Sequence, residues 1–384
     1  MLIIALTGIN LVGFATGSSD EWEQISQNID LILKDIDLSA LDEYIKSGQA
    51  EYLKNYGANA KEIISTLING SDATDFNSYI NLLFSTLFDG VIKLVPLFAG
   101  IVAIGVISCI VNDQTATKVL VKSANDTVRT ACILLTILLV STALTSILAE
   151  LCDCVNSVKT QSEIIMPILL TLTVIVGGSG TTAIFQPAAI FLSSGAIELV
   201  ADFVVPITLS VIIFNFISRI TPSITFFGAS KMIKSLLKWI IGITVTVYSI
   251  FLGVQGTTSS LFDGILFKAT KYLIGNSVPI VGNFLSGGVD LLSASGTLIR
   301  SSVGLSGIIM LIFQVAQPII NLLSFSFMLK FTASVIQPLG DAGLYGLVFD
   351  LSQDVEYFIA GLLMVAFMYV LIIMLVINSA NFFI

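Results

Sequence analysis

A glycine-rich stretch, Gly177-Gly-Ser-Gly180, is the first candidate for chemistry. Gly178, Gly180 and Ala183 have the G-x-G-x-x-A spacing of a dinucleotide-binding turn, and Glu198 follows twenty residues after Gly178. In a βαβ unit such glycines let the backbone approach a pyrophosphate, and the acid binds a ribose hydroxyl. Here the glycines lie between uncharged apolar runs. We therefore interpret Gly177, Gly178 and Gly180 as a break or tight turn whose backbone is buried by protein or faces a water-filled cavity.

A second chemical candidate is Ser235-x-x-Lys238, the spacing at which a lysine can activate a serine. A catalytic lysine must be desolvated to lose its proton near neutral pH, whereas Lys231, Lys234 and Lys238 form a basic cluster typical of a cytoplasmic membrane interface. A membrane serine-lysine hydrolase is thus a weak alternative, and we expect no enzyme.

Metal and redox chemistry have little support in the composition. Histidine is absent, which removes the commonest general base and metal ligand. Cys152 and Cys154 form a C-x-C without the second pair that a tetrahedral site needs. We therefore expect no catalytic residue, metal site or cofactor.

Composition predicts a membrane protein. The chain has 384 residues, of which 55% are hydrophobic and only 11% charged, whereas soluble domains have roughly 25% charged residues. The net charge of −9 comes entirely from the region before Val91, because 13 acids and 13 bases follow it. An acidic region does not favour nucleic acid or anionic lipid, which both need a basic face.

The N-terminal ninety residues divide into two parts. Residues 1–17 are apolar and end in small residues, which predicts a signal peptide; cleavage is favoured over a retained anchor. Residues 18–90 form an acidic region in which Trp22, Ile25, Ile29, Ile32 and Ile36 recur at helical spacing. We expect a helical extracytoplasmic region whose acids are a solvated face or a docking surface for a basic partner.

Nine apolar segments are expected to cross the membrane in a multi-pass domain over 91–384. They are 91–111, 131–149, 164–177, 183–201, 203–218, 236–254, 303–320, 323–340 and 358–378. A crossing needs about 20 mostly apolar residues, and seven crossings remain if two short segments are re-entrant. The fold class predicted is all-α, a polytopic helical membrane protein with seven to nine transmembrane segments.

Positive loops predict the orientation, because they stay on the cytoplasmic side. One loop contains Lys118, Lys122 and Arg129, and another runs from Arg219 to Lys238. The C-terminus is then expected inside. The parts expected outside are the acidic N-terminal region, Glu150 with Asp153, the junction with the interface acids Glu198 and Asp202, and a loop over 341–356.

Other candidate helix-break or conduit positions are polar residues in apolar surroundings. Proline removes a backbone hydrogen bond that a neighbouring glutamine can replace, so Gln186-Pro187 and Gln317-Pro318 predict kinks. The sequences around these two Gln-Pro pairs are loosely similar, and broken helices in two repeats can form a transporter site. We favour chance similarity between two apolar helices over such a repeat. Lys330 is the one charged residue in the otherwise uncharged stretch 301–340. Its side chain must reach the membrane surface, pair with an acid or line a polar path.

Residues 256–302 are too polar for a confident crossing and are expected at the outer interface or packed on the bundle. Within them, VPIVGNFLSGGVDLL (278–292), followed by IRSSVGLSG (299–307), resembles the stage III sporulation protein AE family of endospore-forming bacteria. The block WIIGITVTVYSIFLGVQG (239–256) is similar to the same family. The resemblance runs in order over essentially the whole chain.

The resemblance implies a membrane-embedded core or conduit subunit of a secretion-like channel complex between mother cell and forespore, needed for late forespore sigma-factor activity. It implies a multi-pass location in the mother-cell membrane around the forespore. The implied partners are ring-forming intermembrane proteins, a cytoplasmic ATPase and small membrane proteins of the same operon. The alternative from another class is a stand-alone transporter that uses the broken helices.

Overall fold

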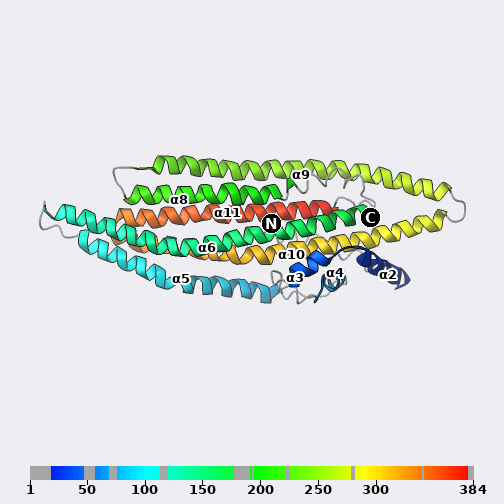
Figure 1. Ribbon diagram of the computed structural model, residues 1–384, viewed down its shortest axis with the longest axis horizontal. Helices are drawn as coiled ribbons and strands as arrows, with labels where there is room; N and C mark the ends of the chain where they lie inside the picture. Colours follow the sequence, from blue (N-terminus) through cyan, green and yellow to red (C-terminus); the bar gives the residue numbers. More distant parts are fainter. Residues whose placement is uncertain are drawn as a thin grey trace.

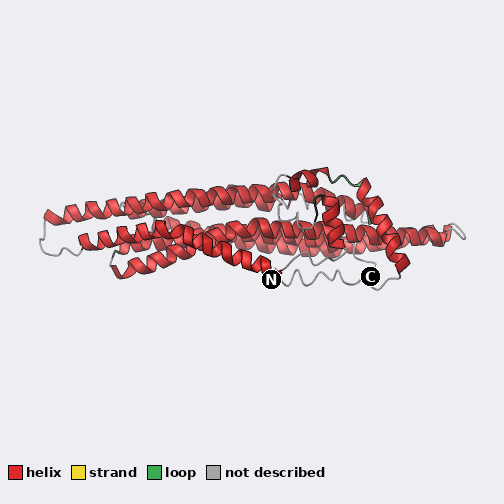
Figure 2. Cartoon of the chain, turned by 90° about the horizontal axis from the view of Figure 1, so that it is seen from below, coloured by secondary structure: helices red, strands yellow, loops and turns green. Residues whose placement is uncertain are grey.

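The structure, a computed structural model, consists of helices joined by short loops in the residues that it describes, and no strand occurs among them (Figures 1 and 2). These residues are 19–46, 57–68, 76–112, 120–176, 191–192, 194–220, 225–277, 282–339 and 341–378. Three short helices come first: α2 (Ser19–Asp35), α3 (Ser39–Lys46) and α4 (Ala60–Ile68). The remaining elements are α5 (Phe76–Asn112), α6 (Leu120–Ile175), η3 (Val200–Val204), α8 (Val205–Ile220), α9 (Phe227–Ser277), α10 (Gly282–Ile336), η4 (Gln337–Leu339) and α11 (Ala342–Asn378). The predicted all-α class is confirmed.

The long helices run side by side along the long axis, with alternating directions (Figure 1). The connections α5–α6, α8–α9 and α10–α11 all lie at one end, which we call the loop end. Helix α11 is central and packs against α6, α8, α9 and α10. Helices α2–α4 lie away from the loop end, where α2 and α4 contact α10 and α3 contacts α6.

Six helices in the described residues are long and apolar enough to cross a membrane. They are Phe84–Ile110, Thr127–Ile175, Ser194–Ile220, Phe227–Phe251, Ser293–Leu339 and Ala342–Ile377. The predicted segment 131–149 and most of 164–177 belong to the single helix α6, and 303–320 and most of 323–340 belong to α10. The predicted count of seven to nine is therefore not confirmed. Helix α11 runs from the loop end to Asn378 at a distance from it, a direction that does not support the expectation that the chain ends on the side of the basic loops.

Exposed apolar side chains mark the part of the long helices that fits a bilayer. On α5 they extend from Phe84 to Ile110, and on α9 with its preceding residue from Phe226 to Phe251. At 1.5 Å per residue either run covers about 40 Å, close to the thickness of a bilayer with its headgroups. We call this zone the apolar belt; α5 and α8 are confined to this half of the molecule (Figure 1). Helix α6 is about 84 Å long and continues well beyond it.

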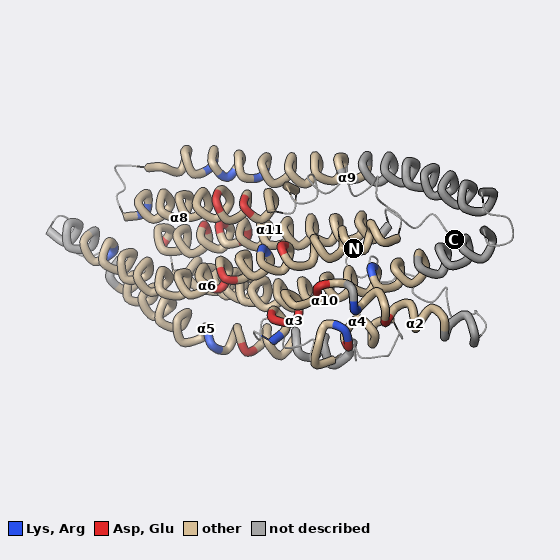
Figure 3. The backbone as a smooth tube through the Cα atoms, turned by 45° about the vertical axis from the view of Figure 1, so that its right-hand side comes forward, with Lys and Arg blue, Asp and Glu red and all other residues tan. Residues whose placement is uncertain are grey.

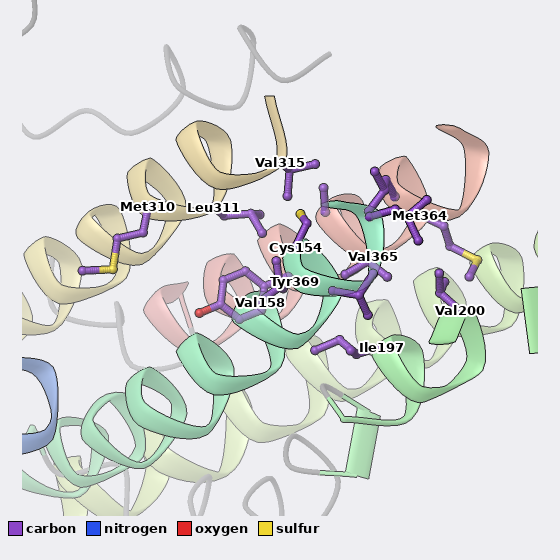
Figure 4. Packing of buried hydrophobic residues seen from close by; sticks show 14 of the residues in the cluster. Cys154, Val158, Ile197, Val200, Met310, Leu311, Val315, Met364, Val365 and Tyr369 are labelled. Atoms are coloured by element: carbon purple, nitrogen blue, oxygen red, sulfur yellow. The ribbon is translucent and has the colours of Figure 1, made fainter. Parts of the chain in front are cut away.

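One continuous hydrophobic core runs through the bundle, and Figure 4 shows the part of it around Cys154. Cys154 and Val158 of α6 lie between Leu311 of α10 and Val365 of α11, and all four are buried. The segments 164–177 and 303–320 are apolar because they face this core, whereas the belt is apolar because it faces outward. Hydropathy alone does not separate these two causes.

Close packing of α10 on α11 depends on Gly304. A Cβ at this position would lie 2.4 Å from Ile377 Cδ1 and 3.1 Å from Ile373 Cγ2, closer than van der Waals contact. The absence of a side chain therefore lets the two helices approach. It also brings the Arg300 guanidinium within 2.7 Å of the Ile377 carbonyl in the last turn of α11, where a cation is favourable.

Replacement of Gly304 by leucine should destabilise the fold by about 1–3 kcal/mol, because the larger side chain overpacks the contact with α11. The same replacement at Gly228 is the control, since a Cβ there meets nothing within 4 Å. Thermal unfolding in detergent should show a lower melting temperature for Gly304→Leu alone. Equal melting temperatures would contradict the close-packing role.

The acidic N-terminal helices are docked through an apolar stripe. Ile25, Ile29, Ile32 and Ile36 are all buried, which confirms the predicted stripe; Trp22 lies outside the residues whose side chains are described. Tyr44 of α3 is also buried, and its hydroxyl accepts a hydrogen bond from Gln314 Nε2 of α10 at 3.4 Å. Burial raises the pKa of Tyr44 to about 12.

Docking of α3 should weaken at alkaline pH. An unfolded tyrosine titrates near 10, so the neutral hydroxyl of Tyr44 contributes stability that is complete below pH 10 and lost as the pH rises through about 12. The melting temperature of the wild type should fall more steeply between pH 10 and 12 than that of Tyr44→Phe, which cannot ionise. Parallel curves would show that Tyr44 does not carry this dependence.

Candidate functional site

Every acidic residue at the start of α11 pairs with a base from a different helix. The ion pairs are Asp341 with Arg129 of α6, Asp350 with Arg219 of α8, Asp354 with Lys234 of α9, and Glu356 with Lys330 of α10. We call these four pairs the α11 charge cluster. Figure 3 shows these acids and bases gathered in the loop-end half of the bundle. The central helix is thus tied to four of its neighbours.

The cluster corrects the predicted topology. The segment 341–356 was expected as an outer loop on the opposite side from the basic loops, but it is the first part of helix α11 and lies at the loop end with them. Arg219 Nη2 and Asp350 Oδ2 are 2.6 Å apart, which is incompatible with opposite sides of a bilayer. The acids pair with Arg129, Arg219 and Lys234 of the basic segments within the protein.

Asp354 is the most deeply buried member of the cluster. Its side chain is 0% exposed, Lys234 Nζ lies 2.5 Å from Oδ1, and Asn215 Nδ2 donates to Oδ2 at 2.6 Å. One carboxylate oxygen therefore accepts a hydrogen bond and the other has the Lys234 ammonium as its ion-pair partner, as a buried charge requires. Helices α8, α9 and α11 meet at this one carboxylate.

Arg219 occupies a space that a glycine leaves open. Its guanidinium lies 4.7 Å from the centre of the Phe227 ring and pairs with Asp350. A Cβ on Gly346 would come within 2.2 Å of Nη2, so a side chain there would displace the guanidinium. The glycine one turn before Asp350 is what allows the pair to form.

Lys330, a predicted conduit or contact residue, pairs with Glu356, and both side chains are about half exposed. Glu198 pairs with Lys159 of α6 at 3.3 Å, whereas Asp202 lies in the π-helical turn η3 and is exposed. Pro206 cannot donate to the Asp202 carbonyl, and Val205 N–H instead bonds to the Val200 carbonyl five residues back. The regular i,i+4 face predicted for the two acids is thereby interrupted.

A polar groove of about 330 Å³ lies between α5, α6 and α10, at the boundary of the apolar belt away from the loop end. Gln317, another predicted conduit residue, lines it. So do Glu150 and Asn321, joined by hydrogen bonds of 2.8 and 2.9 Å from Asn321 Nδ2 to the carboxylate. Asp89 and Lys93 of α5 complete its charged lining.

Pro318 does not break α10, which continues to Ile336. Proline cannot donate to the carbonyl four residues earlier, and that carbonyl, of Gln314, accepts a hydrogen bond from Cys154 Sγ at 3.6 Å. The donor that replaces the missing backbone hydrogen bond is therefore the Cys154 thiol of α6, whereas the sequence predicted Gln317. The second proline of this region, Pro338, lies in η4, after the end of α10.

The other predicted conduit positions, Gly177, Gly178, Gly180, Gln186 and Pro187, lie outside the described residues. Helix α6 ends at Ile175, directly before the glycines. Among the described residues no group of three or more potential metal-ligating side chains comes together. Ser235 and Lys238 are both exposed on α9.

The acids of α11 were missed as site residues. Asp350 and Asp354 are one helical turn apart, Glu356 follows two residues later, and no charged residue occurs after it. An ionisable residue in such apolar surroundings is by default a functional-site candidate. Treating 341–356 as a loop hid this signal.

Long apolar helices around a charged central helix define a polytopic α-helical membrane protein. A model of the family described as stage III sporulation protein AE matches residues 58–380, so the chain belongs to that family. It is 23% identical to the stage III sporulation protein AE of Bacillus subtilis (strain 168) over 376 residues, which cover 97% of this chain and 93% of the relative. No solved structure matches the chain. The resemblance inferred from the sequence motifs is confirmed, and the protein is a sporulation membrane protein.

Loss of the Lys234 ammonium should destabilise the bundle strongly. Lys234→Met leaves the Asp354 carboxylate buried with one neutral partner, which costs about 3–5 kcal/mol. Lys231→Met, one turn earlier on α9, is the control, because Lys231 is exposed and has no ion pair with a described residue. Melting temperatures in detergent should separate the two variants.

Adding Asp354→Asn to Lys234→Met should restore most of the lost stability, since asparagine leaves no buried charge and can still bond with Asn215. A double variant as unstable as Lys234→Met would assign the loss to packing of the lysine stem.

Proposed function

We propose that this chain is a membrane-embedded core subunit of a channel-like complex between mother cell and forespore. The observation that carries the proposal is the division of the surface into two zones. An outward-facing apolar belt about 40 Å long occupies one half, and the other half holds the docked acidic helices α2–α4. Such a molecule both sits in a bilayer and presents a structured surface on one side of it.

The charges favour one orientation of this molecule. Arg129, Arg219 and Lys231 belong to the segments that meet at the loop end. Because positive segments remain in the cytoplasm, the loop end would face the mother-cell cytoplasm. Helices α2–α4 would then face the space between the two membranes, where the resemblance places ring-forming partners.

The acids of the docked helices support a docking role. Asp37 and Glu43 are exposed, while the apolar stripe of α2 is buried in the contact with the bundle. A partner in the intermembrane space would therefore meet a negative surface and would need a basic one. The cytoplasmic ATPase and the small membrane proteins of the operon would meet the loop end and the belt, respectively.

The polar groove supports a conduit role within such an assembly. Gln317, Glu150 and Lys93 are polar groups at the boundary of the apolar belt, where they need water or a polar partner. In a complex the groove of each copy would line an aqueous path. The stand-alone transporter is less favoured, because α10 runs unbroken through Pro318.

Cysteine labelling in cells tests the proposal. Single cysteines replace Ser26 on α2, Thr225 before α9 and Ser146 in the groove, all exposed positions. The four native cysteines are first replaced by serine, which keeps a hydroxyl donor for the Gln314 carbonyl at position 154. With the protein produced in non-sporulating cells, where the outer side of its membrane is accessible, an impermeant maleimide should reach Ser26→Cys in intact cells and Thr225→Cys only after permeabilisation.

Ser146→Cys reports on the conduit. Its labelling should change when the other proteins of the operon are present, because assembly would alter water access to the groove. Labelling of Thr225→Cys in intact cells, with Ser26→Cys labelled only after permeabilisation, would contradict both the proposed orientation and the docking role. If the topology is as expected but labelling of Ser146→Cys does not depend on the partner proteins, the role as a membrane subunit stands and the conduit role is rejected.

A further inference from the structure

Two opposite charges on the membrane-crossing helices lack a counter-ion. Asp202 belongs to the crossing helix Ser194–Ile220, and Lys238 belongs to the crossing helix Phe227–Phe251. Both side chains are exposed, and neither forms an ion pair with any of the residues that the structure describes. The acids of the α11 charge cluster, in contrast, each have a base as partner. A charge that faces lipid is costly unless it reaches water or an opposite charge.

These two lone charges lie at the same depth in the apolar belt. Phe214 of α8 stacks on Phe226, directly before α9, with ring centroids 5.5 Å apart, so these two positions are level. Helices α8 and α9 are neighbours and run in opposite directions (Figure 1). Asp202 precedes Phe214 by twelve residues, and Lys238 follows Phe226 by twelve. At 1.5 Å per residue, both lie about 18 Å from the stacked rings, on the side away from the loop end.

Asp202 and Lys238 belong to different patches of the belt surface. Lys238 lines a cavity of about 730 Å³ between α9, α10 and α11, and Asp202 does not line it. The residue after Asp202, Phe203, is 58% exposed, so the patch around Asp202 faces outward. A contact between two different patches joins identical copies head to tail, an arrangement that forms a ring when it closes.

The cavity beside Lys238 has the charge that an acid would balance. Its other charged residues, Lys330 and Glu356, pair with each other, so the described lining has a formal charge of +1. A twofold contact through this cavity would bring two positive linings together. A head-to-tail contact would instead bring a carboxylate to Lys238, and copies with the same orientation in the bilayer hold Asp202 at the required depth.

We propose that copies of this chain associate head to tail within the bilayer, with Asp202 of one copy paired to Lys238 of the next. The π-helical turn η3 contains Asp202, and such turns are frequent at functional sites. The contact also has apolar surface on both sides, because Phe203 lies beside Asp202 while Phe327 and Phe331 flank the cavity and are 61% and 58% exposed. The association needs this chain alone, so it does not depend on the proposed conduit role.

Charge reversal tests the contact. The full chain is labelled in separate batches with donor and acceptor dyes and reconstituted into phosphatidylcholine liposomes, where energy transfer between copies measures self-association. Lys238→Asp and Asp202→Lys should each weaken self-association about tenfold, because like charges would then meet at the contact. Lys231→Asp is the control and should associate as the wild type does, since Lys231 lies two turns earlier on α9 and outside the cavity.

Mixing the two reversed variants separates a contact between copies from a folding defect. Every contact between Lys238→Asp and Asp202→Lys joins an acid to a base, so an equal mixture should regain the energy transfer of the wild type. A mixture no better than either variant alone, or wild-type association by either variant alone, would overturn the proposal. So would a wild type that stays monomeric at every protein density, or an equal loss in Lys231→Asp.

Discussion

The ion pairs between α11 and four surrounding helices are the constraint on which the bundle depends. Helices in an apolar medium gain little from burying more apolar surface, so packing and polar contacts must decide their register. Each acid of α11 meets a base from a different element, which fixes α6, α8, α9 and α10 against the same helix. Sliding α11 along its axis would break this set of four pairings, and at the buried Asp354 a lone charge is especially costly.

The fold class could be predicted from composition, but the number of crossings could not. Segments 164–177 and 303–320 have the hydropathy of transmembrane helices, yet Tyr44 of the N-terminal region packs near Cys154 and Gln314 in the same part of the molecule. Their apolar side chains face a core formed by α6, α10 and α11. A hydropathy pattern reports that a side chain avoids water, and it is silent on whether lipid or protein replaces the water.

The candidate site was predictable only in part for a related reason. Gln317 and Lys330 were found because a polar residue in an apolar run is visible locally, and both line cavities of the structure. The partners of Arg219 and Lys234 are more than a hundred residues away in the chain. The rule that assigns positive loops to the cytoplasm treats charges as separate, whereas here the bases are matched by acids that fold back onto them.

The continuity of α6 and α10 has a mechanical consequence. Both helices pass from the apolar belt into the opposite half, and the proline within α10 does not interrupt it. A rod of 55 residues is about 82 Å long, so a tilt of about 10° about its loop end would carry the other end sideways by about 14 Å. Because these helices are continuous, a small reorientation of them within the bilayer would produce a large displacement of the surface that carries α2 and α4.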